Sequence, residues 1–181
     1  MSTLLIIIDP WKYTTYGEEC DDDLSRSIIN FIEDEKFNVV ALASYNCLDE
    51  VKKSSAVWYK RTDTSLSWYN LGYPEPINQQ TQEVLLQYKN SNIRQVSIRH
   101  IEELFKYKTI FKIDKIYFAG AAWDMCVQDR EVGYLNVIKH FPNVEYFTDT
   151  RVIRDQHANI PSMDLYPNWV KISDTLYQYK Q

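Results

Sequence analysis

The chain has 181 residues, of which 45% are hydrophobic and 25% are charged, and its formal net charge is −5. This composition predicts one globular domain over residues 1–181, with a core large enough to be stable without disulfides or a structural metal. A mildly acidic protein gains little from binding polyanions, so the charge argues against a nucleic acid or an anionic membrane surface as partner.

The first apolar stretch is short. Leu4–Ile8 is broken at once by Asp9 and Pro10, which makes it too short for a signal peptide. No apolar run reaches the roughly 18 residues that a transmembrane helix needs. We therefore expect a cytoplasmic protein without a membrane anchor.

The cysteines and glycines exclude two other classes of protein. Cys20, Cys47 and Cys126 are an odd number without CxxC spacing, which argues against a disulfide framework and a zinc knuckle. The four glycines form no glycine-rich phosphate loop. We expect no cofactor, and a flavin- or nucleotide-binding domain is the least favoured of the functional alternatives.

Apolar segments alternate between short buried runs and stretches with helical spacing. Between Asn46 and Gln80 the pattern weakens, and we expect a short helix followed by a long irregular excursion. The remaining elements expected in chain order are a strand at Leu4–Ile8, a helix at Asp21–Lys36, strands at Asn38–Ala43 and Glu83–Lys89, a helix at Ile98–Lys108, a strand at Lys115–Gly120, a helix at Asp124–His140, and strands at Val144–Phe147 and Trp169–Ser173.

This alternation predicts a three-layer α/β/α Rossmann-like fold with a mostly parallel sheet of five or six strands. Ligands of such sheets bind at the carboxyl ends of the strands. Asp9, Lys89 and the segment after Gly120 all follow the expected end of a strand. These positions are therefore the first candidates for a functional site.

Cys126 lies at the first turn of the expected helix that follows Gly120. The positive end of a helix dipole and its unpaired N–H groups stabilise a thiolate, and the same N–H groups can bind an oxyanion. A carboxylate such as Asp9 can accept the thiol proton, and a lysine such as Lys89 can stabilise both negative charges. Each residue also has an ordinary structural interpretation: an apolar filler for the cysteine, a turn for the aspartate, a solvated surface side chain for the lysine.

Two segments resemble the cysteine hydrolase branch of the isochorismatase-like superfamily, which includes nicotinamidases and N-carbamoylsarcosine amidases. Leu4–Tyr13 (LLIIIDPWKY) is similar to the opening strand, which ends in an aspartate. Ile116–Val127 (IYFAGAAWDMCV) is similar to the nucleophile motif, with tryptophan at position 123 where threonine is usual. The matching residues of that motif are Gly120, Ala122, Asp124, Cys126 and Val127.

The resemblance implies a catalytic triad of Asp9, Lys89 and Cys126. Cys126 would attack a carbonyl carbon and form a thioester, with an oxyanion hole made by the N–H groups of Ala122 and Cys126. It also implies a cis peptide bond between Ala121 and Ala122, and a homodimer or homotetramer. The expected activity is hydrolysis of a C–N bond in a small amide or ureido compound.

Nicotinamidase-type relatives bind a metal through an aspartate and several histidines. The stretch Ser44–Lys60 contains no histidine, and His100, His140 and His157 have no metal-ligand spacing. We therefore expect no metal.

The substrate pocket is expected to include Trp11, Tyr13 and Trp123, although core packing is an equal alternative for each aromatic ring. If Trp123 instead fills the pocket, the protein is a catalytically silent relative that binds a small molecule or a protein.

Overall fold

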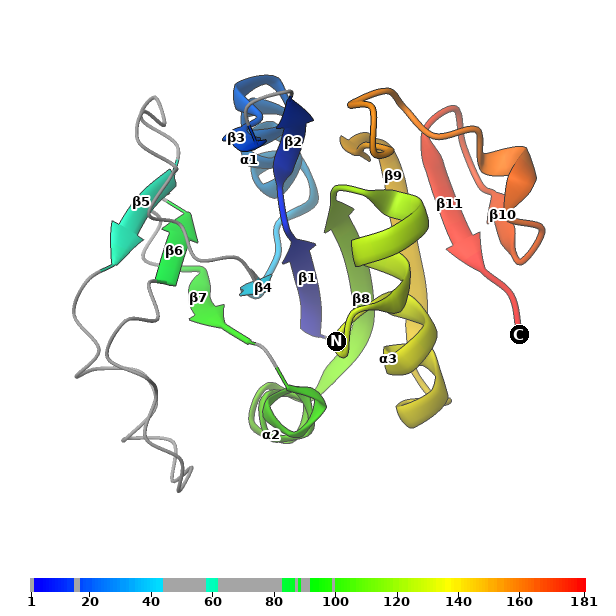
Figure 1. The fold of residues 1–181 in the computed structure, drawn as a ribbon. Coiled ribbons are helices and arrows are strands. Elements are labelled where there is room, and N and C mark those ends of the chain that lie inside the picture. The colour runs from blue at the N-terminus through cyan, green and yellow to red at the C-terminus, as the bar shows by residue number, and fades with distance from the viewer. Residues whose placement is uncertain are drawn as a thin grey trace.

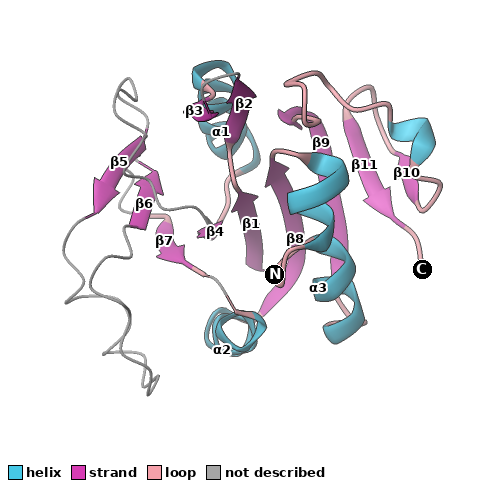
Figure 2. Ribbon diagram, in the orientation of Figure 1, coloured by secondary structure: helices cyan, strands magenta, loops and turns pink. Residues whose placement is uncertain are grey.

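The computed structural model describes residues 2–14, 17–43, 58–61, 83–86, 88, 92–98 and 100–181. Over these residues the chain forms an α/β fold in which helices pack against a seven-stranded, mostly parallel sheet (Figure 1, Figure 2). The predicted fold class is confirmed, whereas the predicted strand number of five or six is too low.

The sheet has a parallel centre and an antiparallel edge. From the hairpin edge the strand order is β10-β11-β9-β8-β1-β4-β7, and the five strands from β9 to β7 run parallel to one another. From β1 the chain moves outward to β4 and β7, then returns to the other side of β1 to form β8. The order of the strands therefore reverses between β1 and β8, which makes this the topological switch point of the sheet. The strands are β1 (Ser2–Ile8), β4 (Val39–Ala43), β7 (Arg94–Ser97), β8 (Ile113–Gly120), β9 (Glu145–Ile153), β10 (Trp169–Lys171) and β11 (Leu176–Tyr179).

The strand expected at Glu83–Lys89 is present in part, but it does not belong to the parallel sheet as predicted. Strand β6 (Glu83–Leu86) pairs antiparallel with β5 (Trp58–Arg61) in a separate two-stranded sheet. The outer parallel strand is instead β7, which pairs with β4 and contains two polar residues before its first apolar one. An edge strand is buried less than a central one, so β7 lacks the apolar run from which the other parallel strands were predicted.

Two other segments differ from the expectation. Strands β2 (Trp11–Thr14) and β3 (Gly17–Cys20) form an antiparallel hairpin directly after β1, which the sequence did not indicate. The short helix and irregular excursion expected between Asn46 and Gln80 lie outside the described residues, apart from β5.

The two faces of the sheet are covered by different helices. Alternate residues of β1 point to opposite faces: Leu5 and Ile7 pack with α1 (Asp22–Glu35), while Leu4, Ile6 and Ile8 pack with α2 (Ile101–Phe111) and α3 (Tyr134–His140). In Figure 1 the sheet is seen with α3 in front of it. None of the helices described is long and apolar enough to span a membrane.

The helix expected at Asp124–His140 is interrupted. A π-helical turn, η3 (Trp123–Val127), is followed by a tight turn and then by α3. The turn closes where the N–H of Gly133 donates to the carbonyl of Arg130 at 2.7 Å. A Cβ on Gly133 would lie 2.7 Å from the carbonyl oxygen of Gln128, so this backbone path requires glycine.

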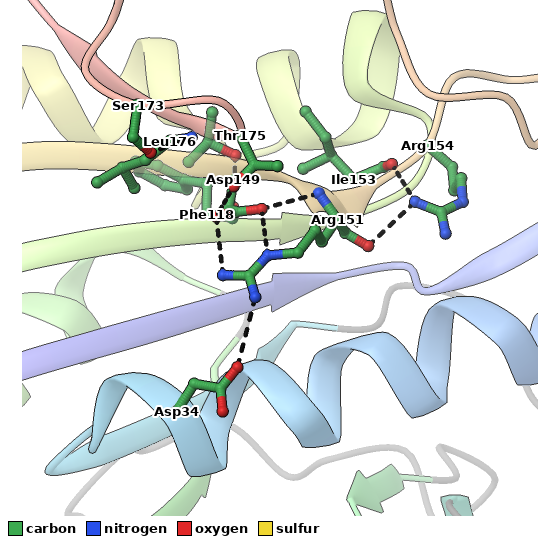
Figure 3. A network of polar contacts seen from close by, with 10 residues as sticks. Asp34, Phe118, Asp149, Arg151, Ile153, Arg154, Ser173, Thr175 and Leu176 are labelled. Atoms are coloured by element: carbon green, nitrogen blue, oxygen red, sulfur yellow. Dashed lines mark hydrogen bonds and ion pairs between the residues drawn. The ribbon is translucent and has the colours of Figure 1, made fainter.

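The buried carboxylate of Asp149, on β9, accepts hydrogen bonds from Arg151 and Thr175 (Figure 3). Asp149 is 1% exposed and accepts hydrogen bonds from Nε and Nη2 of Arg151 and from Oγ1 of Thr175, at 2.9, 3.0 and 2.9 Å. Arg151 also contacts Asp34 of α1 at 3.4 Å. The hydrogen bond to Asp149 raises the pKa of Arg151, outweighing the opposing effect of burial. The charge is thus satisfied by several donors, as burial requires.

The raised pKa of Tyr117 predicts that the folded protein loses stability at alkaline pH. Burial, followed by the charges of Glu35, Glu145 and Asp149, raises its pKa from 10.0 to about 12. The folded protein therefore holds the phenol proton more tightly than the unfolded chain. This contribution to the free energy of unfolding is complete below pH 10 and is lost as the pH rises toward about 12.

We expect urea denaturation to show this alkaline loss, and Tyr117→Phe to reduce its pH dependence. The pKa values of Tyr134 and Tyr146 are also raised by burial, so part of the loss should remain in the variant. An unchanged alkaline slope in Tyr117→Phe would contradict the assignment to Tyr117.

Candidate active site

The ends of β1 and β8 meet at the switch point of the sheet. The N–H of Ala121 donates to the carbonyl of Ile8, and the N–H of Asp9 donates to the carbonyl of Ala43, both at 3.1 Å. Asp9 has a φ of 39°, which is uncommon for a residue other than glycine, although aspartate tolerates it better than most. The backbone around Asp9 is thus held in place from β4 on one side and from β8 on the other.

The carboxylate of Asp9 is buried and bound to a guanidinium. Its exposed fraction is 3%, and Nε of Arg130 donates to Oδ2 at 3.1 Å. Arg130 itself is 34% exposed at the side chain, so the ion pair lies at the boundary between core and solvent. Because a buried carboxylate needs a cation or hydrogen-bond donors, this pairing explains how Asp9 can lie below the surface.

The same guanidinium interacts with Cys126. Burial lowers the pKa of Arg130, but the charges of Asp9 and Cys126, and hydrogen bonds to both side chains, raise it, and the net direction is upward. Cys126 is 7% exposed and lies on η3. The N–H of Arg130 donates to the carbonyl of Cys126 at 3.2 Å, which places the two residues one helical turn apart. Asp9, Arg130 and Cys126 therefore form one cluster, which we call the charge cluster.

Sequence reasoning identified two members of the charge cluster and missed the third. Asp9 and Cys126 are both there, and Arg130 joins them. A signal for Arg130 was present, because residues i and i+4 of a helix share a face. Arg130 follows Cys126 at that spacing.

Lys89 lies outside the described residues, so its role in the triad stays a prediction. The prediction that Lys89 follows a strand of the parallel sheet is wrong, however. The strand that precedes it, β6, pairs with β5 and is not a strand of the parallel sheet. Among the described residues, a cation that contacts both Asp9 and Cys126 comes from the turn after η3.

The prediction of a cis peptide bond between Ala121 and Ala122 is wrong, since every peptide bond of the described residues is trans. The neighbours of Ala122 use their N–H groups within the fold: Ala121 donates to Ile8, and Trp123 to the carbonyl of Arg154 at 2.7 Å. The oxyanion hole expected at the N–H groups of Ala122 and Cys126 stays a prediction.

Trp123 lies in the core. Its ring is 0% exposed and stacks on Tyr134 with centroids 5.0 Å apart, and Trp169 contacts it edge-on at 5.4 Å. A ring without exposed surface cannot contact a ligand in this conformation. This placement agrees with the core-packing alternative, and it connects the two ends of the segment that carries Cys126 and Arg130.

The other two aromatic candidates lie after β1. Trp11 is 2% exposed and packs with the core between the sheet and α1. Tyr13 belongs to β2, and its side chain lies outside what the structure describes. Their predicted role in substrate binding therefore rests on the sequence alone.

No group of three His, Cys, Asp or Glu side chains with the geometry of a metal site occurs in the described part of the chain. The charge cluster has one thiol, one carboxylate and one guanidinium, and a guanidinium is not a metal ligand. Comparisons of the chain with protein-family models, with curated proteins and with solved structures gave no match, so the charge cluster, and not similarity to a known protein, carries the functional argument.

Proposed function

We propose that the protein is a cysteine hydrolase that cleaves a C–N bond of a small amide or ureido compound without a metal, with Cys126 as the nucleophile. The observation that carries this proposal is the charge cluster at the topological switch point. Ligands of doubly wound sheets bind at this place. A thiol that shares a guanidinium with a carboxylate has the two neighbours that an activated thiolate needs.

Each member of the charge cluster has a role in the proposed reaction. Asp9 accepts the proton of Cys126, and the thiolate attacks the carbonyl carbon to form a tetrahedral intermediate. The N–H groups of Ala122 and Cys126 are the predicted donors to its oxyanion. Asp9 then returns the proton to the leaving nitrogen as the C–N bond breaks and a thioester remains. In the second half, Asp9 takes a proton from water and the hydroxide attacks the thioester. The C–S bond breaks, the acid product leaves, and Asp9 returns its proton to the sulfur to regenerate the thiol.

Arg130 does not transfer protons in this scheme, because a guanidinium remains protonated at any working pH. Its role is electrostatic: one cation stabilises the ionised forms of Asp9 and Cys126 together. The contacts of Arg130 with both groups support giving it the part that the family resemblance assigned to Lys89.

A second candidate function is favoured by the burial of the thiol. Cys126 is 7% exposed and Trp123 is 0% exposed, as in a protein that has kept the fold and binds a small molecule or a protein without turnover. In that case Arg130 serves only to neutralise Asp9, and Cys126 is an apolar filler.

Alkylation of Cys126 separates the two candidates. We expect iodoacetamide at pH 7, followed by mass spectrometry of each cysteine, to modify Cys126 faster than Cys20 and Cys47. Arg130→Gln should slow the reaction of Cys126 by about 10-fold, since an opposite charge at contact distance changes a pKa by one unit or more. Arg154→Gln is the matched control, because Arg154 binds the carbonyls of Arg151 and Ile153.

Turnover is measured on the same proteins with a panel of amides and ureido compounds, and Cys126→Ala should lose all activity that the wild type shows. A Cys126 that reacts no faster than Cys20 and Cys47, or that is indifferent to Arg130→Gln, rules out the activated thiolate. Hydrolysis that survives in Cys126→Ala rules out the nucleophile.

A further inference from the structure

Arg130 belongs to the turn between η3 and α3, and this turn is attached to the N-terminus of α2 by its next residue. Oε1 of Glu131 accepts a hydrogen bond from the N–H of Ile101 at 3.1 Å. Oε2 of the same carboxylate lies 3.1 Å from Nδ1 of His100, the N-cap residue of α2. A single carboxylate thus binds one of the otherwise unsatisfied N–H groups of a helix and the side chain that precedes it.

Two backbone hydrogen bonds of the turn are local. The N–H of Arg130 donates to Cys126, and its carbonyl accepts from Gly133. These hydrogen bonds determine the shape of the turn but do not attach it to another element. The contacts of Glu131 attach the turn to α2, while that of Arg130 attaches it to Asp9.

The chemistry of the α2 attachment suits an anion. The Glu131 carboxylate lies at the N-terminus of α2, where it accepts from the N–H of Ile101 at the positive end of the helix dipole. Of the two acids in the first turn of α2, Glu102 is exposed, and Oε2 of Glu103 accepts from the N–H of His100 at 3.1 Å. Glu131 is therefore the acid that connects α2 with the turn.

We propose that Glu131 is a positioning residue: by binding the N-terminus of α2, it holds the turn so that the guanidinium of Arg130 faces Asp9 and Cys126. This inference rests on the proposed function, in which Arg130 stabilises the thiolate. Neighbouring residues of the turn point in different directions, so Glu131 contacts α2 while Arg130 contacts Asp9. Loss of the Glu131 contacts detaches the turn from α2 and weakens the electrostatic interaction between the Arg130 guanidinium and the Cys126 thiolate.

The test measures the rate of Cys126 alkylation by iodoacetamide from pH 5 to pH 10 on the intact protein. The variants are Glu131→Ala, Glu131→Gln and the matched control Glu102→Ala, each made in the wild type and in Arg130→Gln. Glu102 is an exposed acid in the first turn of α2 and contacts neither the turn nor the charge cluster in the structure. A general loss of negative charge at this helix end is thereby controlled.

We expect Glu131→Ala to slow alkylation at pH 7 by about threefold or more and to raise the pH at which the rate is half-maximal, as coupling through a neighbouring residue of one network does. Glu131→Gln should recover part of the rate, because its amide oxygen still accepts from the N–H of Ile101. Glu102→Ala should match the wild type. In the Arg130→Gln background, Glu131→Ala should have no further effect.

A purely structural role has a different signature. If Glu131 only stabilises the fold, its loss opens the structure, exposes the buried thiol and speeds alkylation without changing the pH midpoint. That result, or an effect of Glu131→Ala that persists in Arg130→Gln, overturns the positioning role. If Arg130→Gln slows alkylation and Glu131→Ala does not, this inference fails and the proposed function stands. If Arg130→Gln itself has no effect, the proposed function fails first.

Discussion

Replacing Gly120 with alanine should lower the free energy of unfolding by about 4 kcal/mol or more, an unusually large effect for one methyl group. Gly120 has a φ of 124°, a backbone conformation that residues other than glycine rarely adopt. A Cβ placed there would lie 1.8 Å from the carbonyl oxygen of Ile8. That oxygen belongs to the central strand and cannot move away, because it accepts the hydrogen bond from Ala121. The loss of stability comes from displacing two adjacent central strands at the switch point.

Urea denaturation followed by circular dichroism measures this effect, with Ala121→Gly as the matched control. Ala121 is the next residue and also contacts Ile8 through its N–H. Its replacement by glycine should cost only about 1 kcal/mol, since it adds backbone freedom and removes one methyl group. A Gly120→Ala protein as stable as Ala121→Gly would show that β1 and β8 do not approach each other this closely.

Trp123→Ala should be the second most damaging substitution, with an expected loss of about 3–5 kcal/mol in the free energy of unfolding. The ring is fully buried and contacts three aromatic side chains: Tyr134 by stacking, and Tyr166 and Trp169 edge-on. Its removal leaves a cavity between η3, α3 and the C-terminal strands. Since Trp123 and Tyr134 border the segment that carries Cys126 and Arg130, alkylation of Cys126 should also lose its dependence on Arg130.

Trp123→Phe is the control for this prediction. Phenylalanine keeps an aromatic ring against Tyr134, so most of the stability should be retained. Arg130→Gln should then still slow the alkylation of Cys126 when it is combined with Trp123→Phe. If Trp123→Ala is instead about as stable as the wild type and fails only in ligand binding, the sequence-based assignment of Trp123 to the substrate pocket holds.

The central strands could be predicted from the sequence because they are buried on both faces. Leu4–Ile8 and Val39–Ala43 have no polar side chain, as strands between two helical layers require. Strand β7 could not be found in this way, because three of the four residues in its sequence Arg-Gln-Val-Ser, at the edge of the sheet, are polar. The apolar run at Glu83–Leu86 was the stronger signal, yet it belongs to the small β5–β6 sheet.

The candidate site was predictable to the extent that it lies at strand ends. Asp9 and Cys126 follow β1 and β8, and position in a parallel sheet was enough to place them at one edge. Arg130 could not be found by that reasoning, because it follows no strand and its contact with Asp9 joins residues 121 positions apart. The interruption of the helix after Val127 was also hidden, since only the close approach of Gly133 to Gln128 reveals it.

The one-turn spacing of Cys126 and Arg130 has a consequence for how the site assembles. Their separation is determined by a few consecutive residues, whereas Asp9 reaches them only through the packing of η3 on the ends of β1 and β8. Any fluctuation that lifts this short segment from the sheet removes nucleophile and cation together and separates both from the carboxylate. Assembly of the site is therefore a single cooperative event, and the reactive arrangement exists only while that segment is docked.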